Sequence, residues 1–461
     1  MRELPDWLTS RALAMPDRIA LSVASREWTF AELDEEASRV ARRLHALGVR
    51  AGDRVATLLP NNLASSILPH ATLRLGAILA PLNTRLTRAE IEWQVENLAP
   101  PTIIDSEEKL NGPDSGDIEL RLSYPENAVA AIIYTSGTTG NPKGAMLTVG
   151  NFWWSAVGSA LNLGTLPEDR WLACLPLFHV GGLSIITRSA IYGIQAIVHE
   201  SFDEHRVNDA IDSDGASIVS VVAVMLERML DARGSVPYPS SLRCVLLGGG
   251  PASTSLLERA ASLNVPVVQT YGLTETCSQL ATVSPVDAAR KPGSAGKPLY
   301  PNEIRISDDD EIVVRGPVVM QGYYENPAAT SAAIVDGWLH TGDAGRIDEE
   351  GFLYVLDRRD DLIVTGGENV YPAEVESALS SHPAIEEAAV IGIPDQSWGQ
   401  RVIAIVRSNS AVSASDLIAH CESRLARYKI PRELRFSEKP LPRTAAGKLK
   451  RAALREEATS Q

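Results

Sequence analysis

The sequence predicts an α/β fold, with a large first part followed by a smaller α+β part. Helical and strand patterns alternate through residues 30–275, which is typical of α/β proteins. After Pro292 apolar and polar residues alternate around acidic turns, a pattern that indicates antiparallel hairpins. The chain has 461 residues. At about 150 residues per domain, this length suggests two to four domains or subdomains.

The elements of the large part can be justified in chain order. Residues 30–48 carry apolar side chains at helical spacing and end in glycine, which favours a helix stop there. The further expected elements are a strand over 53–60, a helix leading into a strand over 63–82, a helix over 150–164, a strand over 170–177, a strand leading into a helix over 216–230, a strand breaking into a glycine turn over 242–253, and a strand ending at a polar loop over 265–275.

The second half is predicted to be richer in strands. Residues 303–324 read as antiparallel hairpins, and residues 351–383 read as a hairpin followed by a helix. The stretch from 386 to 436 reads as a small α+β unit. A dense charge cluster at 356–361 suits an exposed connection, so we predict domains at 1–357 and 358–461. A tight turn inside one domain is the alternative for this cluster.

Composition limits the classes of partner. The formal net charge is -15 and no basic face is evident, so nucleic acid is not an expected partner. The four cysteines form no CxxC pair, which predicts neither a zinc site nor a disulfide framework and fits a reducing compartment. The first residues lack the apolar core of a signal peptide, and the apolar run at 217–230 is too short to span a bilayer. We therefore expect a cytoplasmic protein without stable membrane insertion.

The loop "YTSGTTGNPKG", residues 134–144, is the first sign of chemistry. Glycines and small hydroxyl residues let backbone N–H groups converge on an anion, and Lys143 adds a positive charge. The loop follows the apolar strand pattern "AVAAIIY", and α/β folds bind ligands at strand ends. Because Gly144 rather than Ser or Thr follows the lysine, this is not the common GxxxxGK[ST] loop. A triphosphate is the anion that such a cradle suits.

Further motifs follow in order: "GGGPAS" at 248, "YGLTET" at 271, "GWLHTGD" at 337, "YVLDRRDD" at 354, "GGENVYPAEVE" at 366 and "PRTAAGKLKR" at 442. With the loop, they resemble the adenylate-forming enzymes over nearly the whole chain. The resemblance implies a large N-terminal domain of α/β subdomains with a small β-barrel-like subdomain, and a small mobile α+β C-terminal domain. It also implies a two-step reaction. A carboxylate attacks the α-phosphate of ATP, and a thiol, usually CoA, then displaces AMP.

The same resemblance implies an ATP site. Thr274 would donate to the α-phosphate, and Glu275 would hold Mg²⁺, a hard cation that prefers oxygen ligands. Tyr271 would stack on adenine, and Asp343 with Arg358 would bind the ribose hydroxyls. The other residues that the resemblance assigns to ATP are Thr135, Ser136, Gly137, Thr138, Thr139, Gly140, Lys143, Gly249, Gly250, Pro251 and Gly272.

The C-terminal motifs would serve both steps. The resemblance makes Asp360 the hinge about which the small domain turns, because a few connecting residues absorb such a motion. Gly366 and Gly367 would let the thiol arm of CoA pass. Lys448 would bridge the reacting carboxylate and the α-phosphate during adenylation only.

For the acid substrate, residues 150–164, 175–193, 271–279 and 361–379 resemble 2-succinylbenzoate–CoA ligases of menaquinone biosynthesis. That aromatic acid carries two carboxylates, and the unreacted one calls for a cation. Arg188 lies in an otherwise apolar helical stretch, where an unpaired arginine is costly and should meet an anion. We expect that anion to be the benzoate carboxylate. A protein acid or solvent exposure is the alternative. His179, Ser220, Gly249 and Cys277 are the other candidates to line the acyl group.

Other readings stay open at this point. The acid could instead be a benzoate, a malonate or a medium-chain fatty acid. A catalytically silent binding homologue is disfavoured, because Lys143, Glu275, Asp343 and Lys448 are all present. The oligomeric state, for which a homodimer or homotetramer are candidates, does not follow from the sequence.

The assignment of Lys448 gives the first testable prediction. Lys448→Ala should lose most adenylation, measured as pyrophosphate release, because the charge that bridges carboxylate and phosphate is gone. It should spare thioester formation from preformed acyl-adenylate. Equal losses in the two half-reactions would contradict this role.

Overall fold

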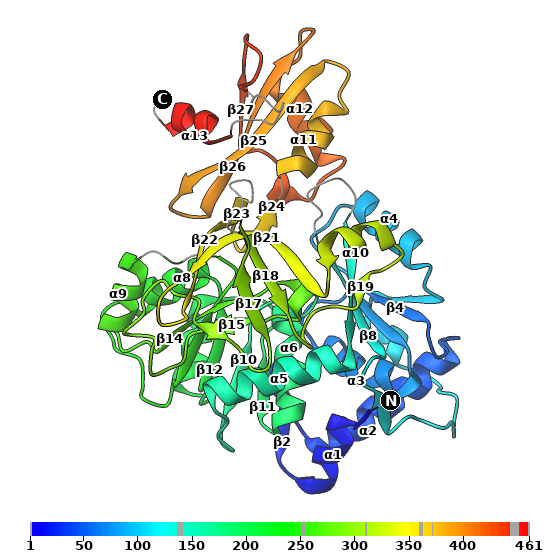
Figure 1. The fold of residues 1–461 in the computed structure, drawn as a ribbon. Helices are drawn as coiled ribbons and strands as arrows, with labels where there is room; N and C mark the ends of the chain where they lie inside the picture. The colour runs from blue at the N-terminus through cyan, green and yellow to red at the C-terminus, as the bar shows by residue number, and fades with distance from the viewer. Residues whose placement is uncertain are drawn as a thin grey trace.

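The fold was analysed in a computed structural model, which describes residues 2–135, 142–250, 252, 254–308, 311–358, 363–370, 372–442 and 451–459. The alternation predicted for the large part is confirmed, because helices cover two sheets there (Figure 1). The small part stands apart at the top of that view, with its own sheet and helices.

The first sheet carries the predicted anion loop at its edge. Its six strands run in the order β19-β9-β8-β5-β4-β6. The four inner and edge strands from β8 to β6 are parallel, and β9 turns back antiparallel to β8. Their bounds are β4 Arg54–Thr57, β5 Ile78–Pro81, β6 Thr102–Ile104, β8 Val129–Thr135, β9 Lys143–Thr148 and β19 Gly322–Tyr323. Helices α2 Phe30–Ala46, α3 Leu63–Leu75 and α4 Arg88–Leu98 begin at capping boxes formed by Thr29, Asn62 and Thr87.

The second sheet contains a topological switch point. Its nine strands run in the order β16-β15-β14-β13-β12-β10-β11-β2-β3. From β10 the chain moves outward to β11 and then returns to β12 on the other side, so the carboxyl ends of β10 and β12 flank a crevice where ligands bind in such sheets. The bounds are β2 Ile19–Val23, β3 Arg26–Thr29, β10 Arg170–Ala173, β11 Gln195–Val198, β12 Ile218–Val221, β13 Cys244–Leu247, β14 Val267–Tyr271, β15 Ala281–Thr282 and β16 Lys297–Pro298.

Five helices accompany this sheet. They are α5 Val149–Leu163, α6 Val180–Tyr192, α7 Glu204–Asp212, α8 Ala223–Arg233 and α9 Thr254–Ser262. Helix α6 is buried along almost its whole length, because it lies between the two sheets. A charged residue on α6 therefore has to find its partner inside the protein.

The hairpins predicted after residue 302 form a third, antiparallel sheet. It runs in the order β17-β18-β21-β20, with β22 paired to β21. The bounds are β17 Glu303–Ile306, β18 Glu311–Arg315, β20 Ile334–Val335, β21 Trp338–Ile347 and β22 Leu353–Arg358. Among the described residues, no pairing closes this sheet into the barrel-like form that the resemblance implied.

The small part has its own sheet, in the order β24-β23-β26-β25 with β27 paired to β26. The bounds are β23 Ile363–Thr365, β24 Glu368–Val370, β25 Ile385–Asp395, β26 Gly399–Ser408, β27 Glu433–Phe436, α11 Pro372–Ser380, α12 Ala414–Glu422 and α13 Arg451–Thr459. The hairpin predicted over 351–371 is wrong in its first strand, because β22 pairs with β21 and the hairpin joins β23 to β24. The chain changes sheets between β22 and β23, while the boundary at 357 and 358 stays a prediction.

A buried ionic cluster joins the two parts. The Lys429 ammonium lies 2.8 Å from Glu90 Oε1 on α4 and 2.6 Å from Glu374 Oε1 on α11, and its side chain is 2% exposed. Burial alone would lower the pKa of Lys429, but the two carboxylates raise it above its ordinary value. Since Glu90 belongs to the large part and Glu374 to the small one, the lysine is fully paired only while the parts are docked.

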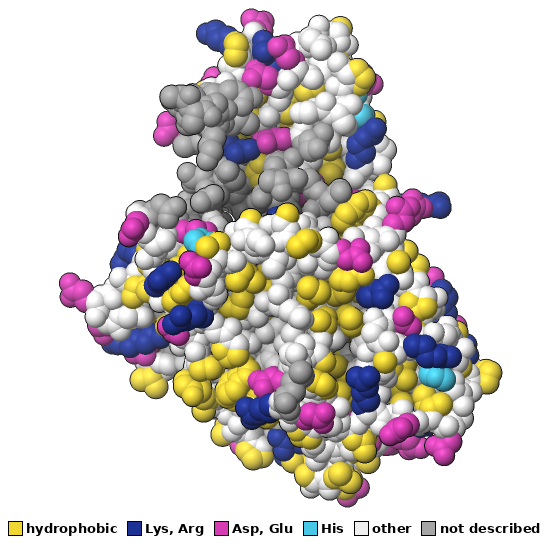
Figure 2. All heavy atoms as spheres, turned by 45° about the vertical axis from the view of Figure 1, so that its right-hand side comes forward, with side chains coloured by type: hydrophobic (Ala, Val, Ile, Leu, Met, Phe, Trp, Pro, Cys, Tyr) yellow, Lys and Arg dark blue, Asp and Glu magenta, His cyan; other side chains and the backbone are white. Residues whose placement is uncertain are grey.

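The surface in Figure 2 shows basic and acidic side chains interspersed over that face, with hydrophobic side chains scattered between them. Across the described residues, no helix is both long enough and apolar enough to cross a bilayer.

Candidate active site

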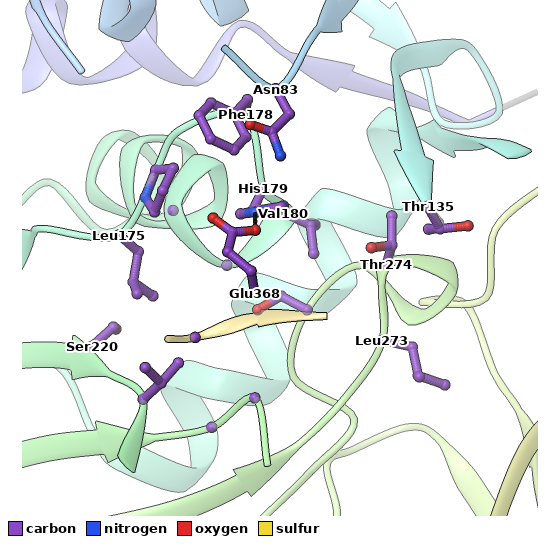
Figure 3. Close-up of a pocket in the computed structure, with 18 of the residues that line it drawn as sticks. Asn83, Thr135, Leu175, Phe178, His179, Val180, Ser220, Leu273, Thr274 and Glu368 are labelled. Carbon is purple, nitrogen blue, oxygen red and sulfur yellow. Dashed lines mark hydrogen bonds and ion pairs between the residues drawn. The ribbon is translucent and has the colours of Figure 1, made fainter. Parts of the chain in front are cut away.

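A cavity of about 290 Å³ opens where the two large sheets and the small part meet. The end of β8, the start of α6, the end of β12 and the turn after β14 contribute to its wall. The small part adds Gly366, Gly367 and Glu368 from its first hairpin, as Figure 3 shows for Glu368 beside His179. The pocket therefore lies at the switch point of the second sheet and is completed by the small part.

The turn from residue 272 to 280 places the "YGLTET" side chains. A side chain at Gly272 would put its Cβ 1.6 Å from the Ser278 carbonyl oxygen, so only glycine fits this close approach. Thr274 and Glu275 then lie in a short 3₁₀ turn, and both line the cavity. The Glu275 carboxylate accepts a hydrogen bond from the Tyr323 hydroxyl at 2.8 Å.

Lys143 contacts the same tyrosine that binds Glu275. Its ammonium lies 5.3 Å from the centroid of the Tyr323 ring, within cation–π range. Tyr323 thus links Lys143 on β9 to the Glu275 carboxylate. Thr135, at the end of β8, donates to the Lys143 carbonyl at 3.4 Å. This corner brings together one cation, one carboxylate and a hydroxyl at the root of the predicted phosphate loop.

The predicted adenosine residues lie on neighbouring strands. Tyr271 donates its hydroxyl hydrogen bond to Asp343 Oδ2 at 2.7 Å, and Asp343 is 4% exposed. Arg358 stands opposite Asp343 in the β21–β22 ladder. The hydrogen bond from Tyr271 orients the Asp343 carboxylate.

The acyl end of the pocket contains a buried arginine. Arg188 on α6 is 2% exposed, and its Nη2 donates to Ser155 Oγ at 2.8 Å. Its guanidinium carbon lies 5.8 Å from the centroid of the Trp171 ring. Among the described residues, no carboxylate pairs with Arg188, and its Nε has no hydrogen-bond partner. Burial lowers the pKa of Arg188. The described residues supply no carboxylate of the kind that a buried arginine needs as its counter-charge.

The wall around Arg188 is fixed by hydrogen bonds. Ser155 donates onward to the Cys277 carbonyl at 2.7 Å, and Trp171 Nε1 donates to Ser220 Oγ at 2.9 Å. Ser220 lines the cavity at the end of β12, whereas the Cys277 thiol is fully buried behind the turn. These contacts hold α5, α6, β10 and the turn in one arrangement.

His179 and Glu368 meet at the entrance from the small part. His179 Nε2 lies 3.4 Å from Glu368 Oε2, and Arg85 forms an ion pair with the other carboxylate oxygen. Burial alone would raise the pKa of Glu368, but His179 and Arg85 lower it below its ordinary value. Glu368 is therefore a buried carboxylate that stays ionised at neutral pH.

The structure gathers most of the described candidate residues at one cavity. Those that line it are Thr135, His179, Arg188, Ser220, Gly249, Gly272, Thr274, Glu275, Gly366 and Gly367. Lys143, Gly250, Tyr271, Cys277 and Asp343 lie outside this lining. Ser136, Gly137, Thr138, Thr139, Gly140, Pro251, Asp360 and Lys448 lie outside the described residues, as does the side chain of Arg358.

Sequence reasoning missed several polar residues of the pocket, of which Glu368, Arg85 and Gln279 matter most here. Glu368 directly follows the paired glycines, and its place in that motif was the available signal. Arg85 and Gln279 also line the cavity. Nothing in the local pattern around Arg85 separates it from ordinary surface residues. Gln279 ends the stretch 271–279 that carries the resemblance, but that resemblance assigned it no role.

Comparisons with known proteins agree with this geometry. The family model for AMP-binding enzymes matches residues 8–324, and that for the AMP-binding enzyme C-terminal domain matches residues 374–448. The chain is 45% identical to a 2-succinylbenzoate–CoA ligase of Bacillus cytotoxicus, over 99% of both chains.

Two solved structures of o-succinylbenzoate CoA synthetase from Bacillus subtilis are also similar. A double mutant bound with its product analogue OSB-NCoA has a TM-score of 0.94 at 43% identity, covering 99% of each chain. The complex with the acyl-adenylate intermediate OSB-AMP has a TM-score of 0.76 at 43% identity, covering 98% of each chain. At equal identity, the arrangement of this chain is more similar to the first.

The close approach at Gly272 leads to a test. Gly272→Ala should displace the turn that carries Thr274 and Glu275 and lower pyrophosphate release from ATP by about 100-fold, the size of effect seen when charge-stabilising groups are misplaced. The free energy of unfolding should fall by roughly 1–3 kcal/mol because the added methyl overpacks the turn.

Gly351→Ala is the matched control. Unlike Gly272, Gly351 has a positive φ, 84°, and nothing lies within 4 Å of an added Cβ. It should lose about 1 kcal/mol of stability from backbone strain and keep its activity. Equal activity losses in the two variants would show that the contact at Gly272 is unimportant.

Proposed function

The chain belongs to the AMP-binding enzyme family, and we propose that it joins 2-succinylbenzoate to CoA through an acyl-adenylate, releasing AMP and pyrophosphate, as a step of menaquinone biosynthesis. The observation that carries the choice of acid is Arg188. It is a buried guanidinium at the pocket wall, without a carboxylate partner among the described residues.

The acid fits this charge pattern. 2-Succinylbenzoate has two carboxylates joined through a ketone and an aromatic ring, and only one of them reacts. With the succinyl carboxylate at Thr274, the benzoate carboxylate would pair with Arg188. Such a pair is charge-assisted and desolvated, so it favours this acid over a monocarboxylic acid of similar size. A plain benzoate or fatty acid would leave the arginine buried and unpaired.

In the first step the protein positions the acid and ATP for attack on the α-phosphorus. Thr274 would donate to the α-phosphate, while Lys143 and the loop after Thr135 would hold the departing phosphates. The Tyr271–Asp343 hydrogen bond would hold the carboxylate toward the ribose. Lys448 would carry positive charge to the reacting oxygens.

Glu275 would hold Mg²⁺, which neutralises charge on the phosphates. Glu275 suits this ion, since its carboxylate lines the cavity and supplies the oxygen ligands that Mg²⁺ prefers. Among the described residues, no group of three or more His, Cys, Asp or Glu side chains gathers at one place. The remaining ligands would therefore come from phosphates and water, as is usual for Mg²⁺ with a nucleotide.

In the second step a thiol reaches the acyl group past the small part. Gly367 lies against Val222, since an added Cβ at Gly367 would come 3.1 Å from Val222 Cγ2. The high similarity to the product-analogue complex supports the proposal that this arrangement serves thioester formation. The small part would turn about Asp360 to serve adenylation, and the Lys429 cluster and the Arg85–Glu368 pair would break in that turn.

A pyrophosphate-release screen over a panel of acids tests the proposed function, with CoA-dependent turnover measured afterwards. 2-Succinylbenzoate should give the highest kcat/KM. If it is inert while a benzoate, a malonate or a medium-chain fatty acid reacts well, the proposed function is wrong.

Arg188→Met should raise KM for 2-succinylbenzoate by roughly 100-fold, because a charge-assisted bond of about 1.5–3 kcal/mol is lost. KM for ATP should stay within about twofold. Methionine is chosen since an apolar side chain of similar volume avoids a buried cavity. Equal changes in both KM values would make Arg188 a structural residue.

Glu90→Gln tests the ionic cluster between the two parts. Loss of one carboxylate leaves Lys429 buried with a single partner, which disfavours the docked arrangement. Thioester formation from preformed acyl-adenylate should slow by about 10-fold, while adenylation stays unchanged or rises. The measurement is single-turnover kinetics of each half-reaction.

Glu92→Gln is the matched control on the same helix, because among the described residues Glu92 forms an ion pair with the exposed Arg88 alone. It should change neither half-reaction. If Glu90→Gln and Glu92→Gln behave alike, the cluster does not govern docking.

A further inference from the structure

Gln279 carries a buried carboxamide at the wall of the pocket. Its side chain is 2% exposed, and neither Oε1 nor Nε2 has a hydrogen-bond partner among the described residues. It lines the cavity. Asn61, a buried carboxamide elsewhere, is satisfied at both ends by Leu175, Leu177 and His199. An amide buried without partners is costly, so a fully unpaired one at a pocket wall points to a ligand.

The backbone around Gln279 is strained and pinned. Cys277 and Ser278, directly before it, both have left-handed φ angles, of 50° and 84°, although neither is glycine. The Ser278 amide donates to the Leu273 carbonyl, and the Leu280 amide donates to the Tyr271 carbonyl at 2.9 Å. Such strain persists only where the surrounding structure enforces it. The turn therefore holds Gln279 in one position.

Gln279 lies on the same turn as residues at both ends of the pocket. Thr274 and Glu275 precede it at the reacting end. The Cys277 carbonyl, two residues before Gln279, accepts from Ser155, which in turn accepts from Arg188 at the other end. A ligand that reaches from Thr274 to Arg188 therefore runs along the turn that carries Gln279.

We propose that Gln279 is a specificity-determining residue that donates from its side-chain amide to the ketone of 2-succinylbenzoate. This rests on the proposed function. In that acid the ketone stands between the two carboxylates, and it offers only an acceptor, which the amide N–H₂ matches.

The recognition of the acid then has three points. Thr274 meets the reacting carboxylate, Gln279 the ketone and Arg188 the benzoate carboxylate. A site that hydrogen-bonds a substrate group discriminates strongly against an analogue that lacks it, because its own polar atoms are then left unpaired. Gln279 would thus reject arylbutanoates of the same shape that have a methylene in place of the ketone.

The test crosses one variant with three acids. Gln279→Met is compared with the unchanged enzyme on 2-succinylbenzoate, on 2-(3-carboxypropyl)benzoate, which lacks the ketone, and on 4-oxo-4-phenylbutanoate, which lacks the ring carboxylate. We expect kcat/KM to fall about 10- to 100-fold on the two ketone acids. On the acid without the ketone, variant and unchanged enzyme should agree within about twofold. KM for ATP and the melting temperature should not change.

Two control variants should not depend on the ketone. Arg188→Met should lose its effect on 4-oxo-4-phenylbutanoate, because the carboxylate that it binds is absent. Gln94→Met alters the pocket-lining glutamine on α4 and should show no dependence on the ketone.

Three results overturn the inference. They are no loss on 2-succinylbenzoate, an equal loss on all three acids, and a loss that vanishes only when the ring carboxylate is absent. If the unchanged enzyme does not use 2-succinylbenzoate at all, the proposed function fails first and the role of Gln279 fails with it.

Discussion

The hydrogen bond from Arg188 to Ser155, made deep inside the protein where the described residues offer no carboxylate, is the constraint on which the acyl end of the pocket depends. Desolvating a guanidinium is expensive, and one neutral hydroxyl recovers only part of that cost. Helix α6 carries the charge, α5 supplies the hydroxyl, and the turn after β14 receives the onward bond at the Cys277 carbonyl. The three elements are therefore held together around Arg188, which has no carboxylate partner among the described residues.

The turn from 272 to 280 is also unfavourable in itself, here because of its backbone conformation. Gly272 allows an approach that any side chain would block, and two non-glycine residues adopt left-handed conformations. As a result, Thr274, Glu275 and Gln279 all line one cavity. Strain is thus concentrated where polar groups have to be aimed at a ligand rather than at each other.

Charged contacts help to hold the small part over the pocket. Lys429 lies between Glu90 and Glu374, and Glu368 meets Arg85 and His179. Ionic groups regain hydration when they separate, so such contacts suit an arrangement that has to open. The small part keeps its own apolar core on both faces of its sheet, which lets it move as a unit.

Local pattern was enough for much of this structure. Helix 30–46 follows from its periodicity and capping box, and Thr274 and Glu275 were found because their motif lies within six residues. The hairpin after residue 351 was assigned to the wrong first strand, since neighbouring strands in the sequence gave no sign that β22 pairs backward with β21. Pairing is a property of sheets, which a local window does not contain.

The sequence by itself determined the α/β class, several helices and strands of the large part, the family and the identity of the charged candidates. Only the tertiary structure decided which charges are satisfied. Arg85 and Glu368 are 283 positions apart, and the bare carboxamide of Gln279 is visible only once everything packed around it is known. The reason is physical. Periodicity is set by the backbone's own repeat, whereas the cost of a buried polar group depends on every segment that surrounds it.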